Sequence, residues 1–306
     1  MEDYGFVEKD RVDYVDHTLA KDGLFTTSIL KEQKKTDCKF YVGMSRWGRK
    51  EWCNSLYPTK TLEKDFLMHY AKHFNSIELN STFYSIPSPY FIKSWKDKVH
   101  FGGNEKMLFI PKVSREISHI NKLKDTTKLL EQYLNAVSEF GENLGPTFIQ
   151  VGEYIGPKYF NTIKDFISTL PKEQEFFFDI RHKEWFNNAD NRQSIFSLFA
   201  DNNIGSIITD TSGDRDIVHM ELTKPELFVR FTGNGEGNWR SDYQRIDAWV
   251  DRIGQWKDKG LRKVYFFVRQ HREDFSPHLA SYLINKLNLR FDANLTPLNL
   301  ELFPPE

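Results

Sequence analysis

Cysteine and long apolar runs are scarce in this chain. Only two cysteines, Cys38 and Cys53, occur among its 306 residues, too few for a disulfide framework. No apolar run approaches the roughly 20 residues that a membrane-spanning helix needs. The N-terminus also lacks the basic-then-apolar pattern of a signal peptide. These absences predict a cytoplasmic protein that keeps its thiols reduced and does not enter a membrane.

A surplus of charge of either sign is lacking as well. The formal net charge is -1, which disfavours a protein whose main task is to coat nucleic acid or an anionic membrane. Aromatic residues make up 15% of the chain and 26 of them are phenylalanine, so enough apolar area is present for a folded core. The length suits one large α/β barrel or two ordinary domains.

Short β-rich segments alternate with amphipathic ones after residue 37. Residues 1–37 are polar and charge-mixed, and we expect a partly disordered N-terminal extension there, followed by a single barrel domain over 38–306. Eight segments rich in Phe, Ile, Val and Tyr predict strands. They are 38–43, 76–80, 106–113, 146–152, 175–181, 205–211, 226–232 and 263–270.

The segments between these strands mostly have helical spacing of apolar residues. In 125–141, for example, Leu130, Tyr133, Val137 and Phe140 fall on one face. Alternating strands and helices predict an α/β fold, a TIM-type (β/α)8 parallel barrel. It would be irregular between the sixth and seventh strands, where no helical pattern occurs. An open doubly wound sheet is the alternative, but no G-x-G-x-x-G follows the first strand.

Polar side chains gather where the predicted strands end, which is where parallel barrels place their active sites. Strand alternation puts Glu78 and Asn80 on one face, and likewise Asp179 and Arg181. Carboxylates and an imidazole are suited to proton transfer, and cations to holding a phosphate or carboxylate. The acid/base candidates are Glu78, Asp210, His182 and Asp179. The binding candidates are Lys112, Arg181, Arg230, Asn80, Trp47, Tyr84 and Trp185.

Two other interpretations of these charges stay open. The groups could form an ion-pair lattice that only closes the barrel top. They could also hold a metal, because suitable ligand types occur at the strand ends, namely Glu78, Asp179, His182 and Asp210. We predict no metal site, since no clustered His or Cys spacing occurs and Lys112 and Arg230 would repel a cation. The sequence names neither a cofactor nor an oligomeric state.

Several motifs, taken in order, resemble one protein family. They are YVGMSRWGRKEW (41–52), HFNSIELNSTFYSIPS (73–88), FIPKVSREISH (109–119), LGPTFIQV (144–151), FFFDIRHKEWF (176–186), IITDT (207–211) and LFVRFTGNG (227–235). Together they resemble the domain-of-unknown-function 72 family, also called YecE-like, over nearly all of residues 39–290. The resemblance implies a TIM-type barrel and no particular reaction.

The resemblance also singles out individual positions. Residues on its motif positions are Glu78, Asn80, Thr82, Phe83, Tyr84, Lys112, Arg181, His182, Trp185, Asp210 and Arg230. The chain departs from the family pattern at Asp179, where a glutamate is usual, and at Arg269-Gln270, where an Asn-Asn pair is usual. The second departure adds positive charge at the predicted mouth.

These observations together predict an enzyme that acts by acid/base chemistry, as a hydrolase or isomerase. Its cationic pocket would take a phosphorylated or carboxylated small molecule or sugar, with His182 as a proton shuttle or oriented by Asp179. A non-catalytic barrel that binds nucleic acid or protein through rim Trp and Arg residues is the alternative, although the near-neutral charge disfavours nucleic acid. A metal-dependent hydrolase or isomerase is the third.

Overall fold

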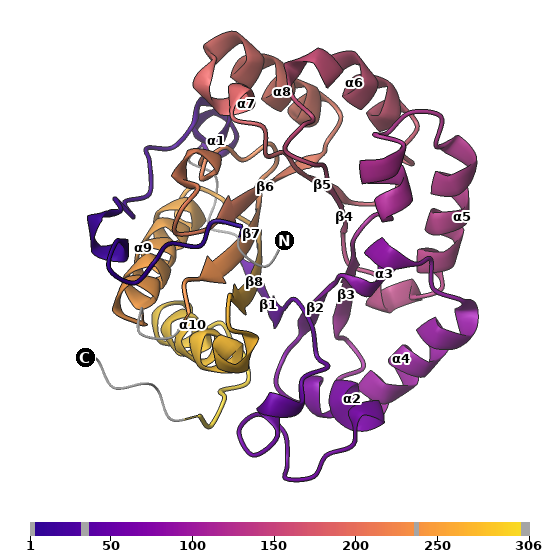
Figure 1. Cartoon of the computed structure of the whole chain (residues 1–306), viewed down its shortest axis with the longest axis vertical. Coiled ribbons are helices and arrows are strands. Elements are labelled where there is room, and N and C mark those ends of the chain that lie inside the picture. Colours follow the sequence, from indigo (N-terminus) through magenta and orange to yellow (C-terminus); the bar gives the residue numbers. More distant parts are fainter. Residues whose placement is uncertain (1–3, 32–36, 236–238, 301–306) are drawn as a thin grey trace.

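All eight predicted strands are present, and they run in one direction around a common centre (Figure 1). The computed structural model describes residues 4–31, 37–235 and 239–300. The strands are β1 (Lys39–Met44), β2 (Ser76–Leu79), β3 (Leu108–Pro111), β4 (Thr147–Gln150), β5 (Phe176–Asp179), β6 (Gly205–Asp210), β7 (Glu226–Gly233) and β8 (Lys263–Gln270).

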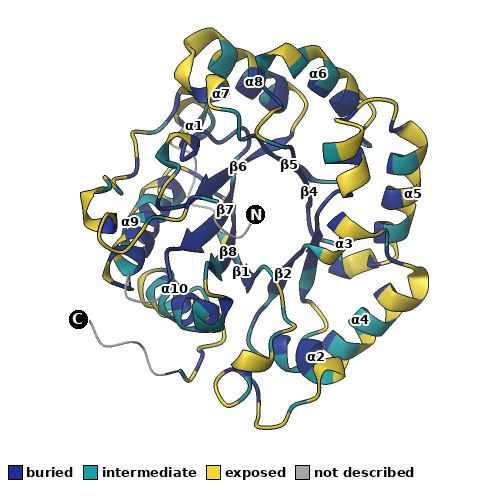
Figure 2. Cartoon of the chain, viewed as in Figure 1, coloured by how far each residue is buried: buried dark blue, intermediate teal, exposed yellow. Residues whose placement is uncertain are grey.

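Helices surround the strands and turn their buried sides inward (Figure 2). They are α1 (Leu24–Ile29), α2 (Phe66–Tyr70), α3 (Ser81–Tyr84), α4 (Pro89–Phe101), α5 (Thr127–Ser138), α6 (Phe160–Ser168), α7 (Glu184–Asn187), α8 (Ala189–Asp201), α9 (Trp239–Lys257) and α10 (Ser276–Phe291). Single 3-10 turns occur at Val12–Tyr14, Lys50–Trp52, Glu63–Asp65, Gly141–Asn143, Pro157–Tyr159, Arg215–Ile217 and Glu273–Phe275, and a π turn at Glu116–Ile120. The described connection between β6 and β7 contains only the turn at Arg215–Ile217, as the sequence pattern predicts.

The strands form a curled parallel sheet of six, in the order β1-β8-β7-β6-β5-β4, and a separate parallel pair, β2-β3. Isolated parallel bridges, Phe109 to Leu144 and Lys112 to Phe148, connect the pair to the β4 side. On the other side, the Asn75 side chain joins the pair to β1. Its Nδ2 donates to the Phe40 carbonyl at 2.7 Å, and its Oδ1 accepts from the Val42 amide at 2.8 Å.

A small apolar cluster fills the space enclosed by the strands. It consists of Ile110, Phe148, Phe177, Ile207, Phe228, Tyr265 and Phe267. The residues that alternate with these, such as Ile149, Phe178 and Ile208, belong to the larger core between strands and helices. Because successive side chains of a strand point to opposite faces, each strand contributes to both cores.

The N-terminal arm, defined as residues 4–31, packs against the rest of the chain. Val12, Leu19 and Leu30 are buried. The Thr26 hydroxyl donates to the Met220 carbonyl at 2.8 Å, and the Arg252 guanidinium pairs with Asp22 at 2.9 Å. The described part of the arm therefore contacts the rest of the chain, while residues 1–3 and 32–36 of the expected partly disordered extension lie outside the described residues.

Candidate functional site

A polar layer lies directly above the apolar cluster, two residues further along each strand. Ile110 is followed by Lys112, Phe148 by Gln150 and Phe177 by Asp179. Likewise Ile207 is followed by Thr209, Phe228 by Arg230 and Phe267 by Arg269. Side chains two residues apart in a strand lie on the same face, so these polar groups point inward, as the apolar ones do. The layer is therefore a consequence of strand alternation and register.

Arg230 is the centre of this layer. Its Nε and Nη2 donate to the two oxygens of Glu78 at 2.9 and 2.8 Å, a bidentate pair. Its Nη1 donates to Asp179 Oδ2 and to Gln150 Oε1, both at 2.8 Å. Asp179 also pairs with Arg181 at 3.0 Å. Two carboxylates and two guanidinium groups thus neutralise one another.

The carboxylates of this lattice are held ionised. Burial would raise the pKa of Glu78, but Arg230 and Asn80 outweigh it and hold the pKa below its usual value. Burial acts in the same sense on Asp179, and there Arg181 and Arg230 hold the pKa low. Neither group is poised to exchange protons near neutral pH, so the geometry favours positioning roles for both.

Lys112 is buried beside the lattice, and no carboxylate in the described part of the chain pairs with it. Its Nζ donates to Gln150 Oε1 at 2.9 Å and lies 4.1 Å from the centre of the Phe83 ring. Burial, together with the positive charges of Arg230 and Arg181, holds the pKa of this amine well below its usual value.

A cavity of about 600 Å³ opens above the polar layer. Its lining carries six cationic side chains, Arg46, Arg49, Lys112, Arg181, Arg230 and Arg269, and two carboxylates, Glu78 and Glu273. The binding candidates Trp47, Asn80 and Tyr84 also line it. Asn80 Nδ2 donates to Glu78 Oε1 at 2.9 Å, and the Tyr84 side chain is exposed.

Arg269 differs from the other arginines beneath the cavity. Its Nε has no hydrogen-bond partner within the described part of the chain, and its guanidinium forms no ion pair there. Burial lowers its pKa, with only partial compensation from Glu273, yet a guanidinium stays charged in proteins. Arg269 therefore presents a cation to the cavity that no described carboxylate neutralises.

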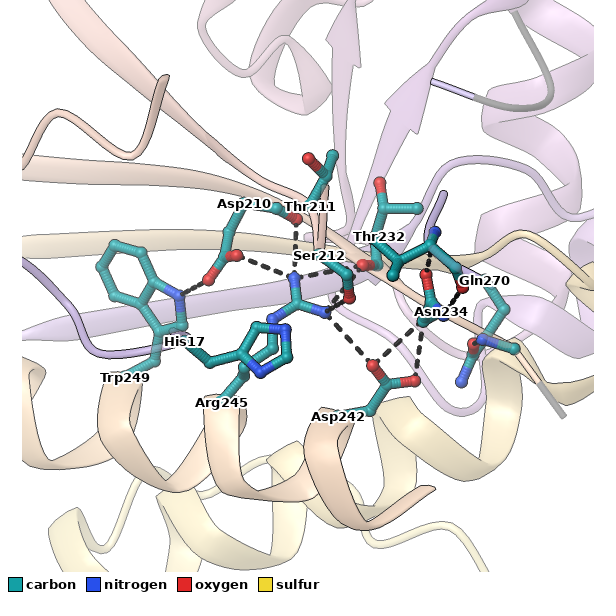
Figure 3. Close-up of polar contacts among 12 residues, drawn as sticks. His17, Asp210, Thr211, Ser212, Thr232, Asn234, Asp242, Arg245, Trp249 and Gln270 are labelled. Atoms are coloured by element: carbon teal, nitrogen blue, oxygen red, sulfur yellow. Dashed lines mark hydrogen bonds and ion pairs between the residues drawn. The ribbon is translucent and has the colours of Figure 1, made fainter. Parts of the chain in front are cut away.

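Asp210 is not among the residues that line the cavity, and its side chain is directed toward Arg245 and Trp249 (Figure 3). Its carboxylate accepts from Arg245 Nη2 at 2.7 Å and from Trp249 Nε1 at 2.6 Å, and it also pairs with Arg215. Strand alternation explains the position, since Asp210 follows the inward-facing Thr209 by one residue. The geometry therefore gives Asp210 a structural contact with α9 in place of the acid/base role expected for it.

Three other predicted site residues are also absent from the cavity lining, namely Asp179, His182 and Trp185. His182 Nδ1 accepts from the Glu184 amide at 3.2 Å, and Asp179 binds arginines, so the expected Asp179–His182 pair is not formed. Trp185 is buried and donates from its indole to the Ile155 carbonyl at 2.8 Å. The side chains of His182 and Trp185 lie against Gly156 and Ile155, in the loop that follows β4.

Several cavity residues were not among the sequence-based candidates, and they include Gln150, Arg269 and Tyr4. Gln150 accepts from both Lys112 and Arg230, and its position two residues after Phe148 was a usable signal. Arg269 had the same signal after Phe267. Tyr4, from the N-terminal arm, lines the cavity and places its ring 4.5 Å from the Arg181 guanidinium carbon. Nothing in the local sequence of residues 1–10 indicated that contact.

The described part of the chain comprises residues 4–31, 37–235 and 239–300. Within these ranges no group of three or more His, Cys, Asp and Glu side chains is arranged to hold a metal ion. Over the same residues, no helix has the length and apolar character to span a bilayer. Cys38 and Cys53 are free thiols.

Comparison with known proteins gives one consistent match. The model of a family described as "Protein of unknown function DUF72" matches residues 41–301. The UPF0759 protein YecE of Escherichia coli (strain K12) is 23% identical over 234 residues, covering 71% of this chain and 81% of that protein. The UPF0759 protein YunF of Bacillus subtilis (strain 168) is 23% identical over 265 residues, covering 78% and 82%. A crystal structure of a DUF72 family protein from Enterococcus faecalis V583 has a TM-score of 0.64 at 15% identity, covering 82% of this chain and 98% of that one.

Proposed function

Because this chain belongs to the DUF72 family of proteins of unknown function, we propose its function from the cavity itself. It is an enzyme whose cavity binds a small phosphorylated or carboxylated molecule. One observation carries this proposal. Once Glu78 and Asp179 are matched against Arg230 and Arg181, the cations Lys112 and Arg269 remain beside the same cavity without a carboxylate partner among the described residues. A buried surplus of positive charge calls for an anion.

The cations divide into two roles. Arg230 has its guanidinium occupied by Glu78, Asp179 and Gln150, so we assign it to support and remove it from the expected anion clamp. Arg269 and Arg181 hold the anion, because both line the cavity and a guanidinium offers paired donors to phosphate or carboxylate.

The remaining expectations are also proposals. We infer that the sheet of six and the pair β2-β3 act as one eight-stranded barrel. The bridges beside β4 and the Asn75 contacts to β1 support this closure, and Gly43 supports it too, because a Cβ there would lie 2.1 Å from the Ser76 carbonyl oxygen. A single barrel domain over 38–306, after an extension at 1–37, stays a prediction. So does a cytoplasmic location, which the two free thiols support.

The clamp is tested by ligand-dependent thermal stabilisation. Phosphate, pyruvate and lactate are titrated at constant ionic strength, because exposed charges respond to salt. We expect at least one of these anions to stabilise the wild type, and Arg269→Ala to weaken its binding about tenfold or more, which corresponds to about 1.4 kcal/mol. Arg290→Ala, which removes a cation from the outer face of α10, is the matched control and leaves binding unchanged. Equal anion affinities of wild type and Arg269→Ala would contradict the proposal that Arg269 holds the anion.

Exposed aromatic side chains support a second candidate function, the binding of single-stranded nucleic acid. Tyr84, Tyr90 and Phe91 are exposed, and Phe91 lies beside Trp95, which in turn contacts Trp47 at the cavity rim. Such rings suit stacking by unpaired bases. A binding barrel of this kind predicts affinity for single-stranded RNA that falls steeply with salt, with no need for Arg269.

A further inference from the structure

The amine of Lys112 has the surroundings of a nucleophile. It is only 3% exposed, yet it lines the cavity, so a bound molecule can reach it. Its hydrogen bond to Gln150 Oε1 at 2.9 Å and the Phe83 ring at 4.1 Å fix the amine in one place.

The contact with Gln150 also disfavours a positive charge on this amine. Gln150 Oε1 accepts from Lys112 Nζ and, at 2.8 Å, from Arg230 Nη1, so two cationic groups share one neutral oxygen. An arginine does not lose its proton in proteins, so Arg230 stays charged. The repulsion between Arg230 and Lys112 is therefore relieved when the Lys112 amine is neutral. The lowered pKa of Lys112 agrees with this geometry, although the Phe83 ring opposes it by attracting the protonated form.

Lys224 provides a contrast within the same chain. It is also buried, and its Nζ lies 4.7 Å from the centre of the Phe177 ring. However, Lys224 pairs with Glu226 Oε2 at 2.9 Å, and it does not line the cavity. Both lysines are therefore buried beside an aromatic ring. Lys112 differs from Lys224 in two respects: it has no described carboxylate partner, and it lines the cavity.

We propose that Lys112 attacks the carbonyl carbon of an anionic substrate, a 2-oxo acid or a ketose phosphate, and forms an imine with it. This inference rests on the proposed function, because Arg269 and Arg181 would hold the carboxylate or phosphate while the carbonyl faces the amine. The volume of about 600 Å³ lies within the usual range for small-molecule sites.

The step balances without a further reactant. The nitrogen lone pair forms a C–N bond as the C=O π electrons move to oxygen, and a proton passes from nitrogen to that oxygen. The resulting carbinolamine loses its hydroxyl group as water, with a proton from solvent, and a C=N bond replaces the C=O bond. The product is a protonated imine, which withdraws electrons from the neighbouring carbon and makes a bond there easier to break.

Borohydride trapping tests this proposal directly. Pyruvate or dihydroxyacetone phosphate is incubated with the full-length wild-type protein at pH 7, and sodium borohydride then delivers a hydride to the imine carbon. The adduct carries the mass of the carbonyl compound less one oxygen atom. We expect peptide mapping to place it on Lys112 and to find Lys224 unmodified. Lactate, which has the same charge as pyruvate but no carbonyl, gives no adduct.

The outcomes separate this inference from the proposed function. Stabilisation by phosphate or lactate without any borohydride-dependent adduct would overturn the role of Lys112 and leave the anion pocket standing. Neither stabilisation nor an adduct would overturn both. Labelling spread over exposed lysines with Lys112 unlabelled would also refute the proposal. Lys112→Met removes the amine at similar size and is expected to abolish the adduct; the wild-type map stays decisive even if this variant folds poorly.

Discussion

At the residue scale, the strongest constraint is the distribution of charge around Arg230. Its four hydrogen bonds reach Glu78, Asp179 and Gln150, three residues from different strands. A buried carboxylate without such a partner is strongly destabilising, so Glu78 depends on this guanidinium, and Asp179 depends on it together with Arg181. Lys112 and Arg269 have no comparable partner among the described residues. The same layer thus contains an ion-pair lattice around Arg230 whose charges cancel, and two cations, Lys112 and Arg269, that are available to a ligand.

A second buried titratable residue, His219, gives a pH prediction. Burial lowers its pKa to about 3; Nε2 lies 3.0 Å from the Ile207 carbonyl and Nδ1 accepts from the Glu221 amide. The folded state therefore binds a proton less readily than the unfolded state, whose histidine titrates near 6.5. The stabilisation is complete above pH 6.5 and is lost as the pH falls towards 3, by up to about 1.4 kcal/mol per pH unit.

Urea unfolding between pH 7 and pH 4 measures this dependence. We expect His219→Gln to be less stable at pH 7 but to lose less stability on acidification than the wild type. His100→Gln, which removes an exposed histidine, keeps the wild-type slope. Parallel curves for wild type and His219→Gln would show that this imidazole does not control acid stability.

At the element scale, α9 is attached to the strand ends by a buried polar network (Figure 3). Arg245 donates to Asp210, to the Thr232 carbonyl at 3.1 Å and to Asp242 at 3.1 Å. Asp242 in turn accepts from the Asn234 amide. These contacts connect α9 to the ends of β6 and β7, whose connection contains no described α-helix.

This attachment predicts the effect of Asp210→Ala. The change leaves Arg245 buried with one carboxylate partner fewer, and we expect a loss of about 3–5 kcal/mol in the free energy of unfolding. Asp251→Ala, on the exposed face of the same helix, changes it by about 0.5 kcal/mol or less. Anion affinity is unchanged in both, since neither residue lines the cavity. If Asp210→Ala lost anion binding but kept its stability, Asp210 would have to be counted among the residues of the anion site.

The strands could be predicted because their β-branched and aromatic runs are short and bounded by turn residues. Helix α4 was missed because its apolar residues do not form one stripe: Ile92 and Val99 are buried, while Tyr90, Phe91 and Phe101 are exposed. Counting from Phe177 identifies Asp179 as inward-facing, and the same count from Ile207 would have excluded Asp210. Pairings such as Lys112 with Gln150 join residues far apart in the chain, and no local pattern encodes them.

At the scale of the whole molecule, the N-terminal arm connects the outer surface to the cavity. Asn234 accepts from the Val7 amide at 2.9 Å and donates back to the Val7 carbonyl, and Gly5 accepts from the Gly213 amide at 2.8 Å. Gly5 has φ +70°, and a Cβ there would lie 2.2 Å from Thr211 Oγ1. Only a glycine fits this approach. The arm lies outside the residues that match the family, which begin at 41.

Gly5→Ala is therefore expected to detach the start of the arm. Limited trypsin digestion at the exposed Lys9 and Arg11 should become severalfold faster, because the cleaved backbone is released from its contacts. Gly48→Ala, where an added Cβ meets no neighbouring atom within 4 Å, is the matched control. Equal digestion rates for wild type and Gly5→Ala would show that the contact with Thr211 does not hold the arm.

The position of Tyr4 in the cavity wall has a practical consequence for purification. Tyr4 lies only three residues after Met1 in the sequence, so a peptide fused ahead of Met1 would be joined close to this wall along the chain. Ligand screens are therefore best performed on protein from which such a tag has been removed.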